Sequence, residues 1–275
     1  MSTNNLIVVS DLHGGSRLGL CKADGPVLLD EGVKYHASPI QQKMYALWLR
    51  FWNEWVPRVT KGEPYDVCVN GDAVEGKPHG SIASLSDNPD DQLSIARILL
   101  EPIVQNAQTF YVIRGTEAHV GKSGHMEETL AKQLGAKPNE IGQYARYELW
   151  IRVGKGLVHL VHHIGTTGRT HYETSAVQAE VAAMFTEAGR WGQKPPDFVV
   201  RSHRHRFIKV ENPSELGMTI GAVTPGWQAK TPFAYRIPGG RVSTPQFGGL
   251  IIRQGDEDVY MRHKVWTVDR PPTEE

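Results

Sequence analysis

The sequence has little cysteine. Its two cysteines, Cys21 and Cys68, lie far apart and form no Cys-x-x-Cys pair. This excludes a disulfide framework and a zinc site built from thiolates, because both need several cysteines at short, defined spacings. Such sparse use of cysteine is typical of reducing compartments, and we expect an intracellular, cytoplasmic protein.

Net charge and long apolar runs are absent as well. The 30 Lys and Arg residues balance the 30 Asp and Glu residues, so the formal net charge at pH 7 is zero. This excludes a protein that binds nucleic acid through its overall charge, but not one with a local basic groove. No stretch approaches the roughly 18 apolar residues that cross a bilayer, and the N-terminal residues MSTNNLIVVSD do not form a secretory signal. We therefore expect no membrane partner.

The sequence does contain histidines that follow apolar segments. In the stretch LIVVSDLHGG, residues 6–15, an apolar run leads into Asp11 and His13 and is bounded by glycines. Such a run predicts a strand buried on both faces, as in parallel sheets, whose carboxyl ends are where ligands bind. At that end, Asp11 and His13 could hold a metal, could form a hydrogen-bonded pair, or could be unrelated loop residues.

Strands and helices alternate along the first half of the chain. Apolar residues at helical spacing predict helices at 39–59, 87–105, 126–134 and 174–188. The aromatic stripe of the first helix, which includes Trp48 and Phe51, indicates a face packed on a sheet rather than a binding surface. The stretches LIVV, YDVCVN, TFYVIR and DFVVR predict buried strands, and Gly154-Lys155-Gly156 predicts a hairpin turn. This order favours one α/β domain that spans residues 1–275.

Five of the apolar runs end in side chains that can bind metals. They are Asp11 and His13; Asp72; Glu117 and His119; His162 and His163; and His203 and His205. If the strand ends converge, these carboxylates and imidazoles share one cleft, where divalent cations would satisfy both kinds of group. Mixed nitrogen and oxygen donors suit zinc, manganese, iron or nickel better than calcium.

The blocks that carry these side chains resemble the motifs of the calcineurin-like metallophosphoesterase family. They are SDLHGG, NGDAVEG, RGTEAHVG, LVHHIG and RSHRHRF, and they extend from residue 10 to residue 207. The resemblance implies an α/β fold, a four-layer αββα sandwich of two mixed β-sheets flanked by helices. It further implies that residues 206–275 supply antiparallel strands of the second sheet.

The resemblance also implies a cofactor of two divalent metal ions, drawn from manganese, iron, zinc, nickel and magnesium. Asp11, His13 and His205 would hold one ion, Asp72 would bridge the two, and His162 with His203 would hold the other. His162 aligns better than His163 with the His-Gly of the family, although the sequence does not decide between them.

The third block departs from the family pattern. Family members carry Gly-Asn-His here, in which Asn binds the second metal and His protonates the leaving group, whereas this chain has Gly115-Thr116-Glu117-Ala118-His119. The variant Gly-Thr-x-x-His is similar to that of some phage-encoded members. We expect His119 to act as general acid or ligand, with Glu117 a weaker candidate for the missing ligand.

The implied activity is metal-dependent hydrolysis of phosphate esters, in which a hydroxide that bridges the two metals attacks phosphorus. Arg169 and His171 are candidates for binding the phosphate. A phosphodiester, nucleotide or nucleic acid is slightly favoured over a monoester, because basic residues lie near the ligand blocks: Lys77, Arg169, Arg201, Arg204 and Arg206. The alternative, which the altered third block suggests, is a fold that has lost catalysis and serves as an interaction scaffold.

Overall fold

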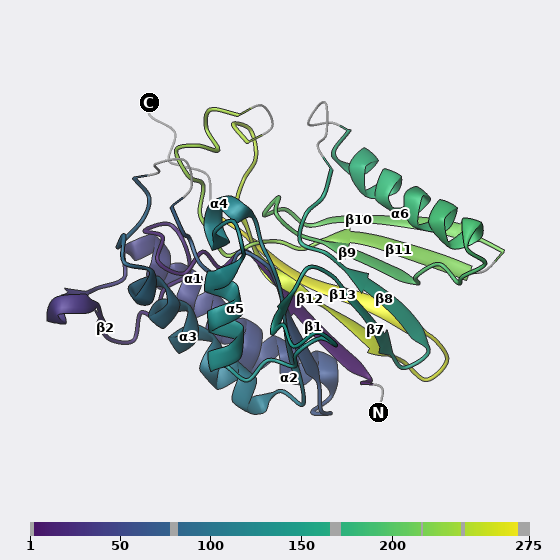
Figure 1. The fold of residues 1–275 in the computed structure, drawn as a ribbon, viewed down its shortest axis with the longest axis horizontal. Helices are drawn as coiled ribbons and strands as arrows, with labels where there is room; N and C mark the ends of the chain where they lie inside the picture. Colours follow the sequence, from purple (N-terminus) through teal and green to yellow (C-terminus); the bar gives the residue numbers. More distant parts are fainter. Residues whose placement is uncertain (1–2, 78–81, 166–171, 216, 238–239, 269–275) are drawn as a thin grey trace.

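Two β-sheets lie between layers of helices (Figure 1). The computed structural model describes residues 3–77, 82–165, 172–215, 217–237 and 240–268. The first sheet has the strand order β13-β12-β1-β4-β5-β6, and the second has the order β10-β11-β9-β8-β7. Both sheets are mixed, as the resemblance implied.

The strands of the first sheet are β1 (Asn5–Val9), β4 (Asp66–Asn70), β5 (Phe110–Ile113), β6 (Ala145–Arg146), β12 (Gln246–Gln254) and β13 (Val259–Thr267). Those of the second are β7 (Leu149–Val153), β8 (Gly156–Leu160), β9 (Phe198–Arg201), β10 (Ile208–Ser214) and β11 (Gly217–Val223). A small separate hairpin consists of β2 (Val27–Leu28) and β3 (Lys34–Tyr35).

The strands that precede the ligand blocks run parallel within each sheet. In the first sheet β1, β4, β5 and β6 are parallel, and in the second β8, β9 and β11 are parallel. The strands of residues 206–275 are divided between the sheets. Only β10 and β11 join the second sheet, whereas β12 pairs antiparallel with β1 and β13 pairs with β12. The expectation that this region belongs wholly to the second sheet is therefore wrong.

The first strand contributes to two separate cores. Leu6 and Val8 belong to the core between the sheets, together with Val158 of the second sheet. Ile7 and Val9 belong to the core beneath the helices that cover the first sheet. Because side chains alternate across a strand, a strand covered on both sides is apolar at every position.

The outer helix layers differ in size. Over the first sheet lie α3 (Pro89–Asn106) and α5 (His125–Gln133), close to the predicted helices at 87–105 and 126–134. The short α4 (Glu117–Val120) follows β5, and the 3-10 helix η1 (Asp30–Gly32) precedes β3. On the other side of the molecule, α6 (Glu173–Arg190) packs Val177 and Val181 against Val199 and Val223 of the second sheet.

The predicted helix at 39–59 forms as three consecutive pieces. These are α1 (Pro39–Arg50), a π-helical turn η2 (Phe51–Trp55) and α2 (Val56–Thr60). Ser38 caps α1, because its hydroxyl accepts from Gln41 N and the Gln41 side chain accepts from Ser38 N. Trp48 is buried and lies edge-on to Trp227, with ring centroids 4.9 Å apart. The aromatic stripe is therefore core, as its spacing indicated.

Both cysteines are buried and free, which agrees with the absence of a disulfide framework. Among the helices described, none is long and apolar enough to cross a bilayer.

Candidate metal centre

The ligand blocks meet where the parallel strands end. Past the end of β1, Asp11 N donates to Gly71 O at 2.9 Å and His13 N donates to Asp72 O at 3.0 Å. From the second sheet, Ser202 N donates to His162 O at 2.9 Å, so the segments after β8 and β9 also stay paired. These bonds carry the regular strand arrangement beyond the sheets and bring residues distant in sequence to one place.

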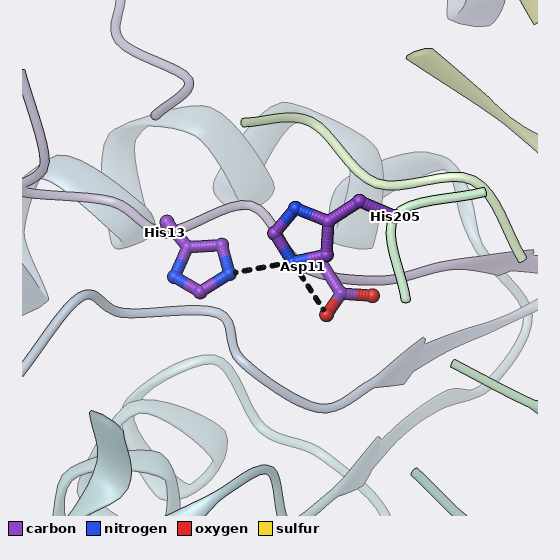
Figure 2. Close-up of side chains that lie close together, drawn as sticks. All are labelled: Asp11, His13 and His205. Carbon is purple, nitrogen blue, oxygen red and sulfur yellow. Dashed lines mark hydrogen bonds and ion pairs between the residues drawn. The ribbon is translucent and has the colours of Figure 1, made fainter. Parts of the chain in front are cut away.

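The first triad consists of Asp11, His13 and His205, whose ligand atoms all lie within 4.8 Å of one another (Figure 2). His205 Nε2 is 3.1 Å from His13 Nε2 and 3.2 Å from Asp11 Oδ1. Asp11 and His13 are buried, and His205 is partly exposed. The triad joins the two sheets, because two of its members follow β1 and the third follows β9.

The second triad consists of Asp72, His162 and His203. Asp72 Oδ2 lies 3.1 Å from His162 Nε2 and 3.9 Å from His203 Nδ1. His162 Nδ1 donates to Asn70 O at 2.7 Å, which fixes the ring and turns Nε2 toward Asp72. His163 is exposed and packs its ring against His162 and His203, but it is not among the grouped ligand atoms, so the structure brings His162 rather than its neighbour into the triad.

The donors present fit divalent cations. Asp11 Oδ1 is buried and has no hydrogen-bond partner in the described part of the chain, although it lies close to His205. A buried carboxylate oxygen without a hydrogen bond costs free energy that a cation would recover. The set of two carboxylates and four imidazoles is that of transition metals or zinc rather than calcium.

The pKa shifts of the triad residues also favour a bound cation. Burial would raise the pKa of Asp11, but His205 outweighs burial and holds that pKa at about 2. Burial opposes ionisation of Asp72 as well, yet His162 keeps its pKa well below the usual value. In turn, burial would lower the pKa of His162, but Asp72 raises it to about 10. Both carboxylates are thus ionised at neutral pH, and His162 holds a proton that a bound cation would replace.

The ligands also have unusual backbone conformations. Of the seven described non-glycine residues with positive φ, five are in the triads: Asp11, His13, Asp72, His203 and His205. A non-glycine residue in this region costs roughly 1–2 kcal/mol, somewhat less for Asp and His. Strain concentrated on residues that lie close together in this way is typical of functional sites.

Thr116 occupies the second triad. Its N–H donates to Asp72 Oδ1 at 2.7 Å, and its hydroxyl lies 3.2 Å from Asp72 Oδ2 and 3.1 Å from His203 Nδ1. The loop comes this close because residue 115 is glycine, where a Cβ would overlap Asp72 Oδ1. The hydroxyl oxygen of Thr116 therefore lies among the side chains of the second triad.

Of the two candidates in the third block, His119 lies beside the first triad and Glu117 does not. His119 is partly buried on α4, and its ring lies edge-on to His13 with centroids 4.5 Å apart. Its Nδ1 donates to Glu75 O at 2.6 Å. Burial and the neighbouring His13 lower the pKa of His119. Glu117 is exposed and belongs to none of the groups of metal-binding side chains found among the described residues.

Glu75 is a buried residue of the site that the sequence did not reveal. Its Oε2 lies 2.9 Å from His13 Nδ1 and accepts from Gln228 Nε2 at 2.8 Å. Together with His13 and His119 it forms a third group of close metal-binding atoms. The only sequence signal was the acid three residues after Asp72, because Gln228 is far along the chain.

Glu127 of α5 lies behind the site and was also missed. Its carboxylate accepts from Ala73 N at 2.9 Å and from Gly115 N at 2.6 Å, and so ties together the loops that carry Asp72 and Thr116. Burial, reinforced by the charge of Asp72, raises the pKa of Glu127 to about 7. Because Glu127 lies in an amphipathic helix, its sequence context gave no sign that it belongs to the site.

Most of the basic residues near the ligand blocks have structural partners. Buried Arg201 pairs with Glu180 at 3.0 Å, Arg206 pairs with Glu173 at 3.3 Å, and Arg204 donates to the carbonyls of Glu173 and Gly165. Lys77 is 3.4 Å from Asp87. The phosphate-binding candidates Arg169 and His171 lie outside the described residues. The preference for a phosphodiester or nucleic-acid substrate, which was based on these basic residues, therefore loses most of its support.

The chain has two mixed sheets with helices outside them, the architecture that the resemblance implied. Among solved structures, vacuolar protein sorting 29 from Cryptosporidium parvum is similar, with 10% identity, coverage of 98% of this chain and 100% of that chain, and a TM-score of 0.38. A predicted phosphoesterase from Streptococcus pneumoniae has 12% identity, 98% and 99% coverage, and a TM-score of 0.35. A Thermotoga maritima protein has 9% identity, 97% and 100% coverage, and a TM-score of 0.37. No protein-family model and no curated protein matches the chain.

Proposed function

We propose that this protein hydrolyses phosphate esters with the help of two divalent cations. The observation that carries the proposal is the pair of triads, each of which takes ligands from both sheets and presents nitrogen and carboxylate oxygen atoms within 4.8 Å of one another. Asp11, His13 and His205 would hold one cation, and Asp72, His162 and His203 the other. By the resemblance, Asp72 would contribute to both.

Bound there, two divalent cations would lower the pKa of a water molecule and neutralise charge on the phosphoryl oxygens. The chain contributes the positions of its side chains. Asn70 O fixes the ring of His162, Glu75 faces the far nitrogen of His13, and Thr116 N supports Asp72. Such contacts hold ligands in productive geometry, and an acceptor at the far nitrogen of an imidazole raises the basicity of its other nitrogen.

His119 would supply the proton for the leaving oxygen. Because its Nδ1 donates to Glu75 O, Nε2 is the nitrogen that can exchange a proton with a substrate. Its ring edge against His13 places that imidazole beside the first triad. These contacts support His119 over exposed Glu117 as the acid of the third block.

The test is hydrolysis of bis(p-nitrophenyl) phosphate and of p-nitrophenyl phosphate after reconstitution with manganese, nickel, zinc or magnesium, beside Asp72→Asn. We expect turnover that depends on metal and is lost in the variant, because the substitution removes a buried charged ligand. Unchanged turnover in Asp72→Asn with metal still bound would refute the proposal. The ratio of the two rates ranks diester against monoester.

A non-catalytic scaffold is the second candidate, and the hydroxyl of Thr116 in place of an amide ligand favours it. Thr116→Val distinguishes the two, because it removes the hydroxyl but keeps the shape and the N–H that supports Asp72. A phosphoesterase should lose turnover or metal affinity in this variant. A scaffold should bind far less than one equivalent of metal with or without the substitution.

A further inference from the structure

The connection between β11 and β12 begins inside the metal centre and continues to the surface. Trp227 N donates to Asp11 O at 2.9 Å, and Gln228 Nε2 donates to Glu75 Oε2 at 2.8 Å. Ala229 N then donates to Leu18 O at 2.7 Å. Figure 1 shows this yellow-green connection at the same end of the molecule as α4, which carries His119. Residues 227–229 are therefore tied to the site and its surroundings by hydrogen bonds, and the exposed part of the connection follows directly after them.

Large apolar side chains are exposed on this connection. Phe233 and Tyr235 are each 58% exposed, and Val242 is 73% exposed. The ammonium group of Lys230 lies 4.1 Å from the centroid of the Tyr235 ring and donates to Arg241 O at 2.5 Å. Lys230 thus supports the ring of Tyr235 from one side and joins the two arms of the connection.

The charge of this region differs from that of the whole chain. Residues 216–255 contain no Asp or Glu but four basic residues, Lys230, Arg236, Arg241 and Arg253, in a protein of zero formal net charge. Arg253 is buried and pairs with Glu63, so it serves the fold. Arg236 and Arg241 are exposed, and neither takes part in an ion pair within the described residues.

Exposed aromatic rings interleaved with unpaired guanidinium groups are the features that bind single-stranded nucleic acid, in which bases stack on rings and phosphates meet cations. We propose that the surface formed by Lys230–Ile237 and Arg241–Val242 binds single-stranded nucleic acid and delivers its phosphodiester to the metal centre. The delivery step rests on the proposed function, whereas the binding does not. The same surface of a second copy of this chain would cover the exposed apolar side chains but would not neutralise the local positive charge.

The test measures binding of a fluorescein-labelled 12-nucleotide oligothymidylate by anisotropy in EDTA, which prevents hydrolysis. We expect Phe233→Ala with Tyr235→Ala to weaken binding at least about tenfold. Arg236→Gln with Arg241→Gln should weaken binding and reduce its dependence on salt concentration. The matched control is Trp191→Ala, which removes an aromatic ring that is 72% exposed at the end of α6, and it should bind as the unmodified protein does.

Three outcomes would overturn the inference. They are no binding of the oligonucleotide by the unmodified protein, equal affinity for a duplex of the same length, and a dimer in sedimentation that the aromatic double variant converts to monomer. The small chromogenic diester separates this inference from the proposed function. Hydrolysis of the diester without binding of the oligonucleotide would refute the nucleic-acid surface alone. Binding of the oligonucleotide without hydrolysis of either the diester or the oligonucleotide would refute the phosphoesterase.

Discussion

At the scale of single residues, the candidate metal centre consists of side chains that could be predicted from the sequence and of others that could not. The six triad residues follow apolar runs in the order that the resemblance to the family implies, so they could be listed from the sequence. Glu75 and Glu127 could not, because their partners are Gln228 in one case and the backbone at positions 73 and 115 in the other. Contacts between residues so distant in sequence leave no local pattern.

We predict that Glu75→Gln weakens metal binding about 10- to 100-fold without unfolding the protein, because a neutral amide no longer faces His13 Nδ1 as a carboxylate does. Competition with a chromophoric chelator measures the affinity. Glu117→Gln is the matched control, since it makes the same chemical change at an exposed position of the third block. Equal affinities for the two variants would show that Glu75 does not position His13.

At the scale of elements, apolar spacing located the helices but not the details that shape the site. The helix at 39–59 was predictable because its apolar residues recur every three or four positions, whereas the π-helical turn at Phe51–Trp55 depends on packing. The placement of β12 beside β1 was also beyond the sequence, because an apolar strand fits either sheet. Short α4 has too few residues for a periodic pattern.

Trp48 tests whether the aromatic stripe of α1 is core. It is 2% exposed and packs edge-on against Trp52 and Trp227. We expect Trp48→Ala to reduce the free energy of unfolding by about 3–5 kcal/mol, because it leaves a cavity in a packed region. Trp191→Ala, at an exposed position, should change it by less than about 0.5 kcal/mol. Urea unfolding compares the two, and equal losses would contradict the packing described for α1.

The link that α5 makes through Glu127 predicts a dependence of stability on pH. Burial raises the pKa of this carboxyl from 4.5 to about 7, so the folded protein holds the proton more tightly than the unfolded chain does. The contribution of protonated Glu127 to the free energy of unfolding is therefore fully present below pH 4.5 and is lost as pH rises to 7. In EDTA, the free energy of unfolding should fall by roughly 2 kcal/mol over this range relative to Glu127→Gln. A difference between the two proteins that is constant with pH would contradict the raised pKa.

At the scale of the whole molecule, the two sheets are arranged so that each triad takes side chains from both. We propose that residues 1–275 act as one domain for this reason, since separation of the sheets would divide both triads. Although the formal net charge of the chain is zero, residues 216–255 are locally basic. The arginines near the ligand blocks looked like a phosphate-binding group in sequence, but most have structural partners, and exposed basic residues lie instead on the connection between β11 and β12.

The central claim is that the two triads together hold two cations, and metal content tests it most directly. After reconstitution with manganese or zinc and desalting, elemental analysis should find about two equivalents per chain. Asp72→Asn should retain less than one equivalent, whereas Asp87→Asn, the same change at an exposed carboxylate, should retain both. Less than one equivalent in the unmodified protein, or unchanged content in Asp72→Asn, would contradict the account.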